Sequence, residues 1–382
     1  MWLFLIILSV LLLGGYSILI ENYRRWFLKI KPFEITGKTA APIRFSIIIP
    51  ARNEEDNIKA CLSTILDQQY PPDQFEVIVI NDHSTDNTRG VIQLLQQQYA
   101  NLRLLDLEAL VKGKPLNSYK KKAIGLAIAQ AYGDWIITTD ADCFVSKNWL
   151  RSYAVFINEH QPVFVAAPVK FINNGSFISI FQCLDFISLQ GITASSVENN
   201  FHSMCNGANL AYSKKVFTAV GGFSGIDNIA SGDDMLLMHK IYLLHPQKVK
   251  FLLSKEAVVQ TAPMPDWKSF LNQRIRWASK ADTYDDKRIF WVLALVYLLN
   301  LLFVGLLIVS FFKPALFLYW LILILCKTAI ELRFMIPVAK FFNETKILWW
   351  FGVMQPFHIF YTVVAGWLGK FGTYKWKGRE VR

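Results

Sequence analysis

Two aspartates one residue apart, Asp140 and Asp142, are the side chains in this sequence best placed for metal chemistry. They follow Trp135–Thr139, a short apolar, strand-favouring run that begins after a Gly133-Asp134 pair typical of a turn. Alternation along a strand would point both carboxylates to the same side. Such like charges repel unless a cation lies between them, and Mg²⁺ or Mn²⁺ suits carboxylate oxygens together with substrate phosphates. Alone, the pair is a weak signal, because polar loop residues often end a strand.

The elements that must position this pair are three predicted strands separated by helices. The strands are Phe45–Pro50, Glu76–Ile80 and the run before Asp140. Strands that alternate with helices indicate a doubly wound, mostly parallel α/β sheet, in which ligands bind at the carboxyl ends of the strands. The polar segments at those ends are Pro50–Glu54, Asn81–Ser84 and Asp140–Asp142. We expect them to face a common crevice, with Asn53 capping the helix that follows the first strand.

The amino-terminal segment is predicted to anchor the chain in a membrane. Residues 1–20 contain no charged side chain and are long enough to cross a bilayer. The segment lacks a basic leading stretch and a small-residue cleavage site, so an uncleaved anchor is favoured over a signal peptide. Arg24, Arg25, Lys29 and Lys31 follow at once, and by the positive-inside rule the chain then continues in the cytoplasm.

The carboxyl-terminal third contains three more apolar segments, residues 289–312, 314–336 and 347–368. Lys327 and Glu331 lie within the second segment at a spacing that lets them pair. Three further spans would place the basic tail outside, against the positive-inside rule. The cations of that tail are Lys370, Lys375, Lys377 and Arg379. We therefore expect one of the three segments to lie along the membrane interface or to re-enter.

Composition excludes several classes of protein. The formal net charge is +11, but the cations flank apolar segments and no nucleic-acid-binding motif appears. We therefore expect no nucleic acid as a partner. Membrane lipids and a nucleotide diphosphate are the expected partners of these cations. The five cysteines show no CxxC spacing. They are interpreted as reduced thiols, which excludes a disulfide frame and a zinc site.

Five motifs, in order, resemble those of the family 2 glycosyltransferases. They are Ser46–Glu54, Val79–Asp86, Asp140-Ala141-Asp142, Gly232-Asp233-Asp234 and the QxxRW segment Gln273-Arg274-Ile275-Arg276-Trp277. The last is typical of the membrane-embedded branch that includes cellulose, hyaluronan and poly-N-acetylglucosamine synthases. The resemblance covers residues 45–277 and implies a GT-A domain, Rossmann-like and mostly parallel, flanked by transmembrane helices. The implied domains are residues 1–35 (anchor and basic linker), 36–285 (cytosolic GT-A domain) and 286–382 (transmembrane or interfacial helices and basic tail).

The sequence departs from the family pattern at three positions. Asn81 stands where an acidic residue is common, His83 where glycine is common, and Asp233 where glutamate is usual. Asp82 and Asp234 still occupy the positions to which the family's roles carry over. Which of Asp233 and Asp234 is the catalytic base stays open.

The resemblance implies a role for each remaining candidate. Donor binding falls to Pro50, Ala51, Arg52, Glu54, Asp82 and Asp140, and metal binding to Asp142 with Asp140. Lys121 could add positive charge near the nucleotide, or could belong to a solvated helix start. Asp234 would take the proton of the acceptor hydroxyl, and an aspartate there can also cap a helix.

The residues assigned to the acceptor and the diphosphate are Gln273, Arg276, Trp277 and Gly207. Arginine binds diphosphate oxygens in a bidentate manner, and a tryptophan ring can stack on a sugar. The alternatives are an amphipathic helix lying on the membrane for the QxxRW segment and a plain tight turn at Gly207.

We therefore expect an inverting glycosyltransferase in the inner (cytoplasmic) membrane, multi-pass and with a cytosolic catalytic domain. It would move a sugar from a nucleotide-diphosphate donor, a UDP-sugar by preference, to a lipid or growing glycan acceptor, with Mg²⁺ or Mn²⁺ as cofactor. Both a processive synthase and an enzyme that adds one sugar fit this description. The alternative class is a non-catalytic membrane protein with a degenerate nucleotide-sugar-binding domain.

Overall fold

The chain folds into two compact units, each assembled from segments that are distant in sequence. A computed structural model describes residues 2–38, 41–111, 118–229, 232–280, 286–371, 374–376 and 379–381. The helical unit comprises Met1–Ile30, Phe171–His202 and Pro263–Arg382, and the sheet unit comprises Lys31–Lys170 and Ser203–Ala262. The domain limits 1–35, 36–285 and 286–382 remain a prediction. The two units differ from them because residues 171–202 and the segment from Pro263 pack with the long apolar helices.

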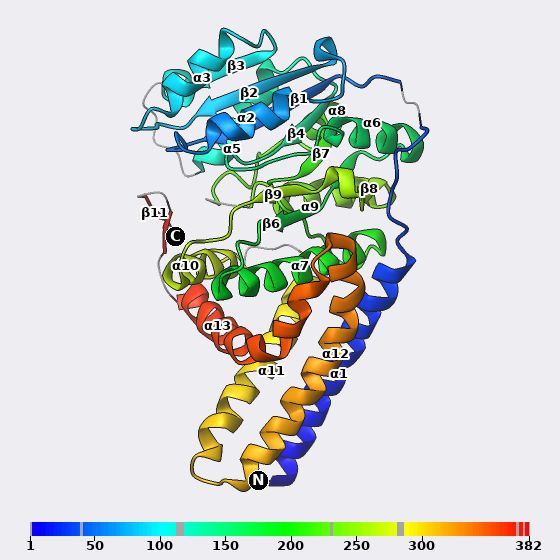
Figure 1. Cartoon of the computed structure of the whole chain (residues 1–382), viewed down its shortest axis with the longest axis vertical. Helices are drawn as coiled ribbons and strands as arrows, with labels where there is room; N and C mark the ends of the chain where they lie inside the picture. Colours follow the sequence, from blue (N-terminus) through cyan, green and yellow to red (C-terminus); the bar gives the residue numbers. More distant parts are fainter. Residues whose placement is uncertain are drawn as a thin grey trace. The chain divides into compact units, whose positions relative to one another are not determined.

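The sheet unit is built on seven strands in the order β3-β2-β1-β4-β7-β5-β8 (Figure 1). These strands are β1 (Phe45–Ala51), β2 (Phe75–Asn81), β3 (Leu102–Asp106), β4 (Trp135–Thr138), β5 (Phe164–Ala166), β7 (Leu210–Ser213) and β8 (Val249–Phe251). Strands β1 to β4 are parallel, whereas β7 runs antiparallel to β4 and β5. A second, two-stranded sheet pairs β6 (Val169–Phe171) with β9 (Val259–Thr261). The predicted mostly parallel α/β sheet is confirmed.

Helices cover this sheet because its central strands are apolar on both sides. In β1, Phe45, Ile47, Ile48 and Ile49 have no exposed surface. The helices are α2 (Ile58–Leu66), α3 (Thr88–Gln96), α4 (Leu107–Val111), α5 (Tyr119–Gln130), α6 (Trp149–His160), α8 (Lys214–Ala219) and α9 (Met235–Leu244). Helices α2 and α3 contact each other, and α5 contacts β1 and β2.

The helical unit contains the predicted apolar segments. Its long helices are α1 (Trp2–Lys29), α7 (Phe177–Glu198), α10 (Trp267–Ala278), α11 (Lys287–Ser310), α12 (Ala315–Phe342) and α13 (Phe351–Phe371), with the 3-10 helix η5 (Thr345–Trp350) before α13. A short hairpin, β10 (Tyr374–Trp376) and β11 (Arg379–Val381), follows. Within the described residues, five helical segments are long and apolar enough to cross a membrane: those of α1, α7, α11, α12 and η5 with α13. Lys377, one of the predicted tail cations, lies outside the described residues.

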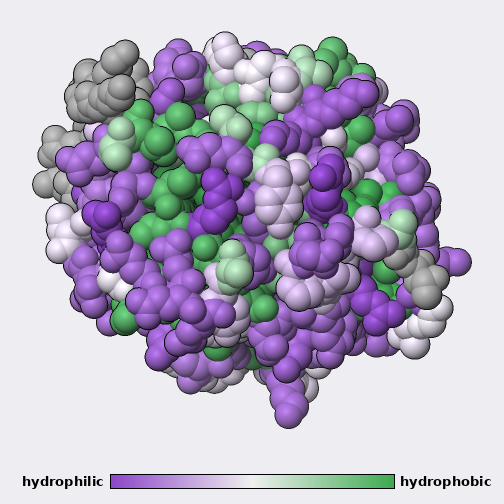
Figure 2. All heavy atoms as spheres, turned by 90° about the horizontal axis from the view of Figure 1, so that it is seen from above, coloured by the Kyte–Doolittle hydropathy of each residue, from purple (hydrophilic) through white to green (hydrophobic). Residues whose placement is uncertain are grey.

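Helices α1, α11 and α12 contact one another pairwise and extend side by side, whereas α13 is inclined to them and contacts α10 and α11 (Figure 1). Pro356 lies inside α13, where proline interrupts the backbone hydrogen-bond ladder. Many apolar side chains on α1, α11 and α12 are exposed, such as Leu11, Trp291 and Leu318. The face of the molecule seen in Figure 2, in contrast, is mostly hydrophilic.

Polar side chains buried between these apolar helices satisfy one another. Lys327 Nζ lies 2.7 Å from Glu331 Oε1, so the predicted pair is present. Gln355 accepts from Lys327 at 2.7 Å and donates to Glu331 at 2.6 Å. Tyr16 of α1 donates its hydroxyl to the same glutamate. These contacts join α1, α12 and α13 in an apolar setting where an unpaired charge would be costly.

Candidate functional site

The loops that follow β1 and β2 are cross-linked by the residues predicted to bind the donor. Pro50 and Ala51 still belong to β1, in register with Ile80 and Asn81 of β2. The guanidinium of Arg52 donates to the backbone carbonyls of Asp82 at 3.0 Å and His83 at 3.1 Å. The two loops therefore form one surface at the carboxyl ends of neighbouring strands.

The prediction that Asn53 caps the next helix is wrong. Helix α2 begins at Ile58 with Asn57 in the cap position. Asn53 has a left-handed backbone (φ 52°), and its side chain accepts from the backbone N–H of Thr85 at 2.8 Å. Glu54 extends the same cross-link, because its backbone N–H donates to the Thr88 hydroxyl at 2.8 Å. Asn53 thus ties the first loop to the second, a role that asparagine performs well in turns.

The structure accounts for two departures from the family pattern. The side chain of Asn81 donates to Asp106 Oδ1 at 3.0 Å, a bond that a carboxylate at position 81 could not make. His83 adopts φ 55°, a region that glycine favours and that histidine also tolerates. Its Nδ1 lies 2.8 Å from Oδ1 of Asp82, which is only 4% exposed. The imidazole therefore holds the Asp82 carboxylate in place.

Asp140 and Asp142 lie in a turn and not in a strand. Strand β4 ends at Thr138, so the alternation expected for the pair does not apply. Asp142 Oδ2 accepts from the Thr261 hydroxyl at 3.1 Å. Burial, followed by the charges of Asp140 and Glu54, raises the pKa of the Asp142 carboxyl. The region around Asp142 is therefore negative enough to favour a bound cation.

The ammonium of Lys120 contacts the carboxylates of Asp140 and Asp233. Its Nζ lies 2.9 Å from Asp140 Oδ1 and 3.3 Å from Asp233 Oδ2. Burial acts to lower the pKa of the Lys120 ammonium, but the charges of Asp140 and Asp233 outweigh it and raise that pKa. Lys121, the lysine named from the sequence, is 2% exposed and donates to the backbone carbonyls of Ile226 at 2.6 Å and Ile229 at 2.7 Å. Lys121 therefore supports a loop, and its neighbour carries the charge at the site.

Asp234 is held by two backbone donors. Its Oδ1 accepts from Met235 N–H at 2.8 Å, the capping bond at the start of α9, and its Oδ2 accepts from Gly207 N–H at 3.0 Å. The carbonyl of Gly207 in turn accepts from the Thr138 hydroxyl at 3.0 Å. A Cβ added to Gly207 would lie 3.4 Å from Asp233 Oδ2 and 3.5 Å from Lys120 Nζ. The Gly207 loop thus joins the end of β4 to the Asp233-Asp234 turn.

The donor set at this site fits a hard divalent cation that shares its ligands with a substrate. Asp140 and Asp142 offer carboxylate oxygens, the ligand type that Mg²⁺ and Mn²⁺ prefer. No three His, Cys, Asp or Glu side chains form a ready metal cage within the described part of the chain. The protein would therefore supply two carboxylates, and the remaining ligands would come from phosphate oxygens and water.

The QxxRW residues lie on α10, which belongs to the helical unit. Gln273 Oε1 accepts from Arg274 Nη1 at 2.7 Å. The same guanidinium lies 4.2 Å from the centre of the Trp277 ring, so one face of that ring is already covered. Arg276, half-buried, completes the motif.

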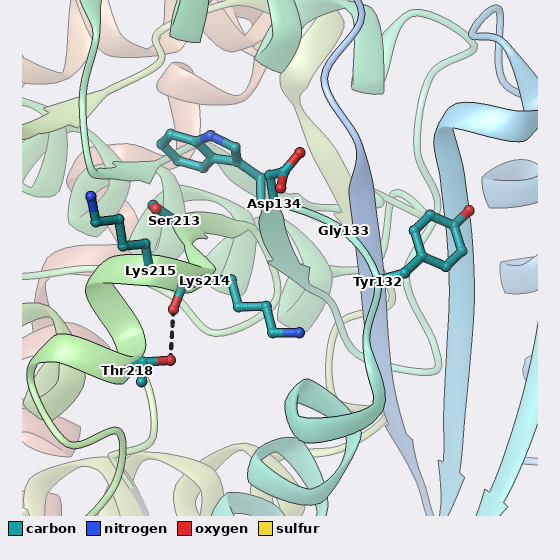
Figure 3. Close-up of a pocket in the computed structure, with 8 residues that line it drawn as sticks. Tyr132, Gly133, Asp134, Ser213, Lys214, Lys215 and Thr218 are labelled. Atoms are coloured by element: carbon teal, nitrogen blue, oxygen red, sulfur yellow. Dashed lines mark hydrogen bonds between the residues drawn. The ribbon is translucent and has the colours of Figure 1, made fainter.

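A hollow of about 490 Å³ lies at the amino end of β4, the opposite end from Asp140 (Figure 3). The residues that line it are Tyr132, Gly133, Asp134, Trp135, Ser213, Lys214, Lys215 and Thr218. In Figure 3 the Thr218 hydroxyl bonds to the Lys214 carbonyl, which is an ordinary contact within a helix. No predicted site residue lines this hollow.

Comparison with known proteins identifies relatives over most of the chain. The family model described as Glycosyl transferase family 2 matches residues 46–221, and that described as Glycosyl transferase family group 2 matches residues 135–368. Probable glycosyltransferase YdaM of Bacillus subtilis is 26% identical over 285 residues, which are 72% of this chain and 63% of that protein. Poly-beta-1,6-N-acetyl-D-glucosamine synthase of Staphylococcus epidermidis is 24% identical over 266 residues, 66% of this chain and 59% of that protein.

A more similar but shorter match is poly(ribitol-phosphate) beta-N-acetylglucosaminyltransferase TarS of Staphylococcus aureus, 32% identical over 133 residues, 34% of this chain and 22% of that protein. The chain thus spans between about a fifth and somewhat under two thirds of these relatives. Among solved structures, mannosyltransferase PcManGT from Pyrobaculum calidifontis, in complex with GDP-Man and Mn²⁺, superposes with a TM-score of 0.57 at 17% identity. The superposition covers 95% of this chain and 97% of that one and confirms the expected GT-A fold.

Proposed function

Because the chain belongs to the family 2 glycosyltransferases, as the match over residues 135–368 shows, we propose that it transfers a sugar from a UDP-sugar to a lipid or growing glycan at the inner face of the cytoplasmic membrane. The observation that carries the proposal is the convergence of the Asp140 turn, the Gly207 loop and the Asp233-Asp234 turn around Lys120. Asp140 on the donor side and the two candidate bases, Asp233 and Asp234, thereby lie near the Lys120 ammonium.

Donor binding falls to the cross-linked loops after β1 and β2. The polar surface formed by residues 50–54 and Asp82 would receive the base and ribose, and Arg52 ties the second loop to the first. The names of TarS and of the Staphylococcus epidermidis synthase specify N-acetylglucosamine, so UDP-N-acetylglucosamine is the first donor to test.

The leaving diphosphate gathers negative charge that the site must neutralise. A divalent cation held by Asp142 and Asp140 would supply Lewis-acid stabilisation of that charge when bound. Thr261 orients the Asp142 carboxylate through its hydroxyl. Lys120 adds an ammonium beside Asp140, where a diphosphate oxygen can replace a carboxylate as its partner.

Asp234 is the proposed base for the acceptor hydroxyl. Its two backbone donors fix the orientation of the carboxylate, while each oxygen keeps a second lone pair for a proton. Asp233 pairs with Lys120, which makes it the poorer proton acceptor. Attack of the deprotonated acceptor on the anomeric carbon, from the face opposite the diphosphate, would invert the configuration.

For the membrane topology we propose that α1, α11 and α12 span and that α13 lies at the interface. This arrangement places the basic tail on the cytoplasmic side, as the positive-inside rule requires. It is supported by the cations at one end of the three helices, which are Arg24, Arg25 and Lys29 in α1, Lys287 and Arg288 in α11, and Arg333 and Lys340 in α12. Trp349 and Trp367, 90% and 59% exposed, suit the headgroup level.

The deciding experiment measures UDP release by the full chain reconstituted in lipid nanodiscs with UDP-N-acetylglucosamine or UDP-glucose. We expect release that requires Mg²⁺ or Mn²⁺ and that Asp142→Ala abolishes together with metal-dependent donor binding. Absence of both binding and turnover with every sugar nucleotide tested would leave the non-catalytic alternative. The acceptor and product length would follow from mass spectrometry of the lipids and glycans missing from a deletion strain. Three spanning helices have too few surfaces to enclose a polymer easily, which favours addition of one sugar. The QxxRW motif, in contrast, favours polymerisation.

A further inference from the structure

Arg274, an unassigned residue of the QxxRW segment, contacts two members of the motif from a buried position. It is 4% exposed, donates through Nη1 to Gln273 at 2.7 Å and stacks its guanidinium 4.2 Å from the centre of the Trp277 ring. The guanidinium also lies 4.6 Å from the Phe270 ring centre. One side chain therefore sets the amide of Gln273 and the indole of Trp277 relative to each other.

Asp185 of α7 holds this guanidinium from the other side. Its Oδ2 accepts from Arg274 Nε at 3.1 Å and from Nη2 at 2.6 Å, and the two side chains are 3% and 4% exposed. The second oxygen of Asp185 accepts from the Tyr361 hydroxyl of α13, and His358 Nε2 lies 3.9 Å from it. Three helices, α7, α10 and α13, thus meet at one buried carboxylate.

Packing alone does not explain an ion pair at this place. Burying two charges costs desolvation energy, and apolar residues of similar size commonly stabilise a helix contact as well or better. A carboxylate and a planar guanidinium also restrict the orientation of the two helices, because the hydrogen bonds of the guanidinium form only over a narrow range of orientations. A leucine pair would let α10 rotate about its axis, whereas this pair does not.

We infer that Asp185 and Arg274 are positioning residues that fix the rotation of α10 and thereby the placement of Gln273, Arg276 and Trp277. The inference rests on the proposed function, in which these motif residues serve the diphosphate and the acceptor. Asp185 and Arg274 themselves touch neither. Tyr361 extends the same constraint to α13.

Arg274→Lys is the sharpest variant, because it keeps the charge beside Asp185 while removing the fork and the flat face. Arg288→Lys is its matched control. Arg288 also donates through Nε and Nη2 to a carboxylate, to Oδ1 and Oδ2 of Asp286 at 2.8 Å each, in the same unit but at the start of α11. A second pair is Tyr361→Phe and Tyr16→Phe, since each tyrosine donates its hydroxyl to a buried carboxylate and only Tyr361 donates to Asp185.

The first readout is hydrogen exchange of the α10 backbone amides in the full chain in nanodiscs of phosphatidylethanolamine and phosphatidylglycerol. We expect Arg274→Lys and Tyr361→Phe to speed exchange in residues 267–278 by at least about tenfold, and both controls to leave it unchanged. Exchange within twofold of wild type in Arg274→Lys overturns the inference, as does equal acceleration in the controls.

The second readout is the share of radiolabelled sugar from UDP-N-acetylglucosamine that is transferred to membrane lipid or polymer, against the share released as free sugar. This ratio does not depend on how much of the protein is active. Arg274→Lys should lower this ratio at least about tenfold, because water replaces a misplaced acceptor. An unchanged ratio overturns the inference. If wild type itself turns over no sugar nucleotide, the proposed function fails, and the exchange comparison alone still decides the positioning of α10.

Discussion

The ammonium of Lys120 lies 2.9 Å from a carboxylate oxygen of Asp140, so the aspartate proposed to serve the donor already has a positive partner. The same ammonium reaches Asp233 at 3.3 Å. Without a ligand, the Lys120 ammonium neutralises part of the negative charge of Asp140 and Asp233. Binding of a divalent cation and a diphosphate would change these ion pairs.

Replacing Lys120 with methionine should weaken donor binding. The variant keeps the length of the side chain but leaves the carboxylates without the ammonium and the diphosphate without a charged donor. We expect the donor KM to rise by about 10- to 100-fold, measured by UDP release at saturating Mn²⁺. Lys122→Met is the control, because Lys122 is exposed on the same helix. Equal effects of the two substitutions would contradict a specific role for Lys120.

Asp142 should make the site pH-sensitive. Because burial and neighbouring carboxylates raise its pKa, the folded chain binds this proton more tightly than the unfolded chain does. The resulting stabilisation is present below the ordinary aspartate pKa and is lost as pH rises through the raised value. At neutral pH without divalent cations, the ionised carboxylate therefore destabilises the fold.

Asp142→Asn should accordingly raise the thermal midpoint in EDTA at pH 7 by roughly 2 °C. In the wild type, Mn²⁺-dependent donor binding should weaken on acidification at a higher pH than an ordinary aspartate would dictate. Calorimetry with and without Mn²⁺ across pH measures both effects. A midpoint in EDTA that falls in Asp142→Asn would count against the charged environment described here.

Asp234→Asn should separate binding from chemistry. Asparagine keeps one acceptor oxygen and can still cap α9, so the fold and donor affinity should persist although the bond from Gly207 is lost. The loss of the proton acceptor should lower turnover by about 10²- to 10⁴-fold. Asp233→Asn tests the other candidate, and Asp67→Asn, an exposed pair with Lys147, controls for a surface substitution. If Asp233→Asn proves the more severe of the two, the roles assigned to the two aspartates must be exchanged.

The membrane arrangement predicts on which side two positions lie. In a Cys326→Ala background, the four remaining natural cysteines are buried. A cysteine at Lys313, in the turn between α11 and α12, should react with an impermeant thiol reagent from outside intact cells. One at Phe371, at the end of α13, should react only after the membrane is opened. Labelling of Phe371→Cys in intact cells would make α13 a true span.

How far the sequence predicts this molecule depends on whether a feature is local. The strand ends and polar loops could be predicted because strand periodicity and turn chemistry act over a few residues. Pro50 and Ile80, the predicted ends of two strands, lie in register in the sheet. Whether Lys120 or Lys121 faces the carboxylates depends on the rotation of α5 against the sheet, which no pattern in three consecutive lysines determines. Asn53 precedes an acidic stretch, as a helix-capping residue often does. Its side chain instead accepts a hydrogen bond from Thr85, which is 32 residues away.

The same distinction explains the limits of the two units. Helix α7 lies between strands of the sheet unit in sequence, but its apolar length packs against α1 and α12. The motif pattern leaves position 274 unspecified, so the sequence does not predict a role for Arg274. Its role depends on Asp185, which is 89 residues away.

The hydrogen bond between Tyr16 and Glu331 joins residues 315 positions apart in the sequence. This separation determines how long Tyr16 exists before its partner is synthesised. At ribosomal rates of about 5–20 residues per second, roughly 15–60 seconds pass between the synthesis of the two residues. If α1 spans the membrane as proposed, its buried Tyr16 lies in the bilayer during that interval without Glu331. The Tyr16 hydroxyl would then need another hydrogen-bond partner until α12 is in place.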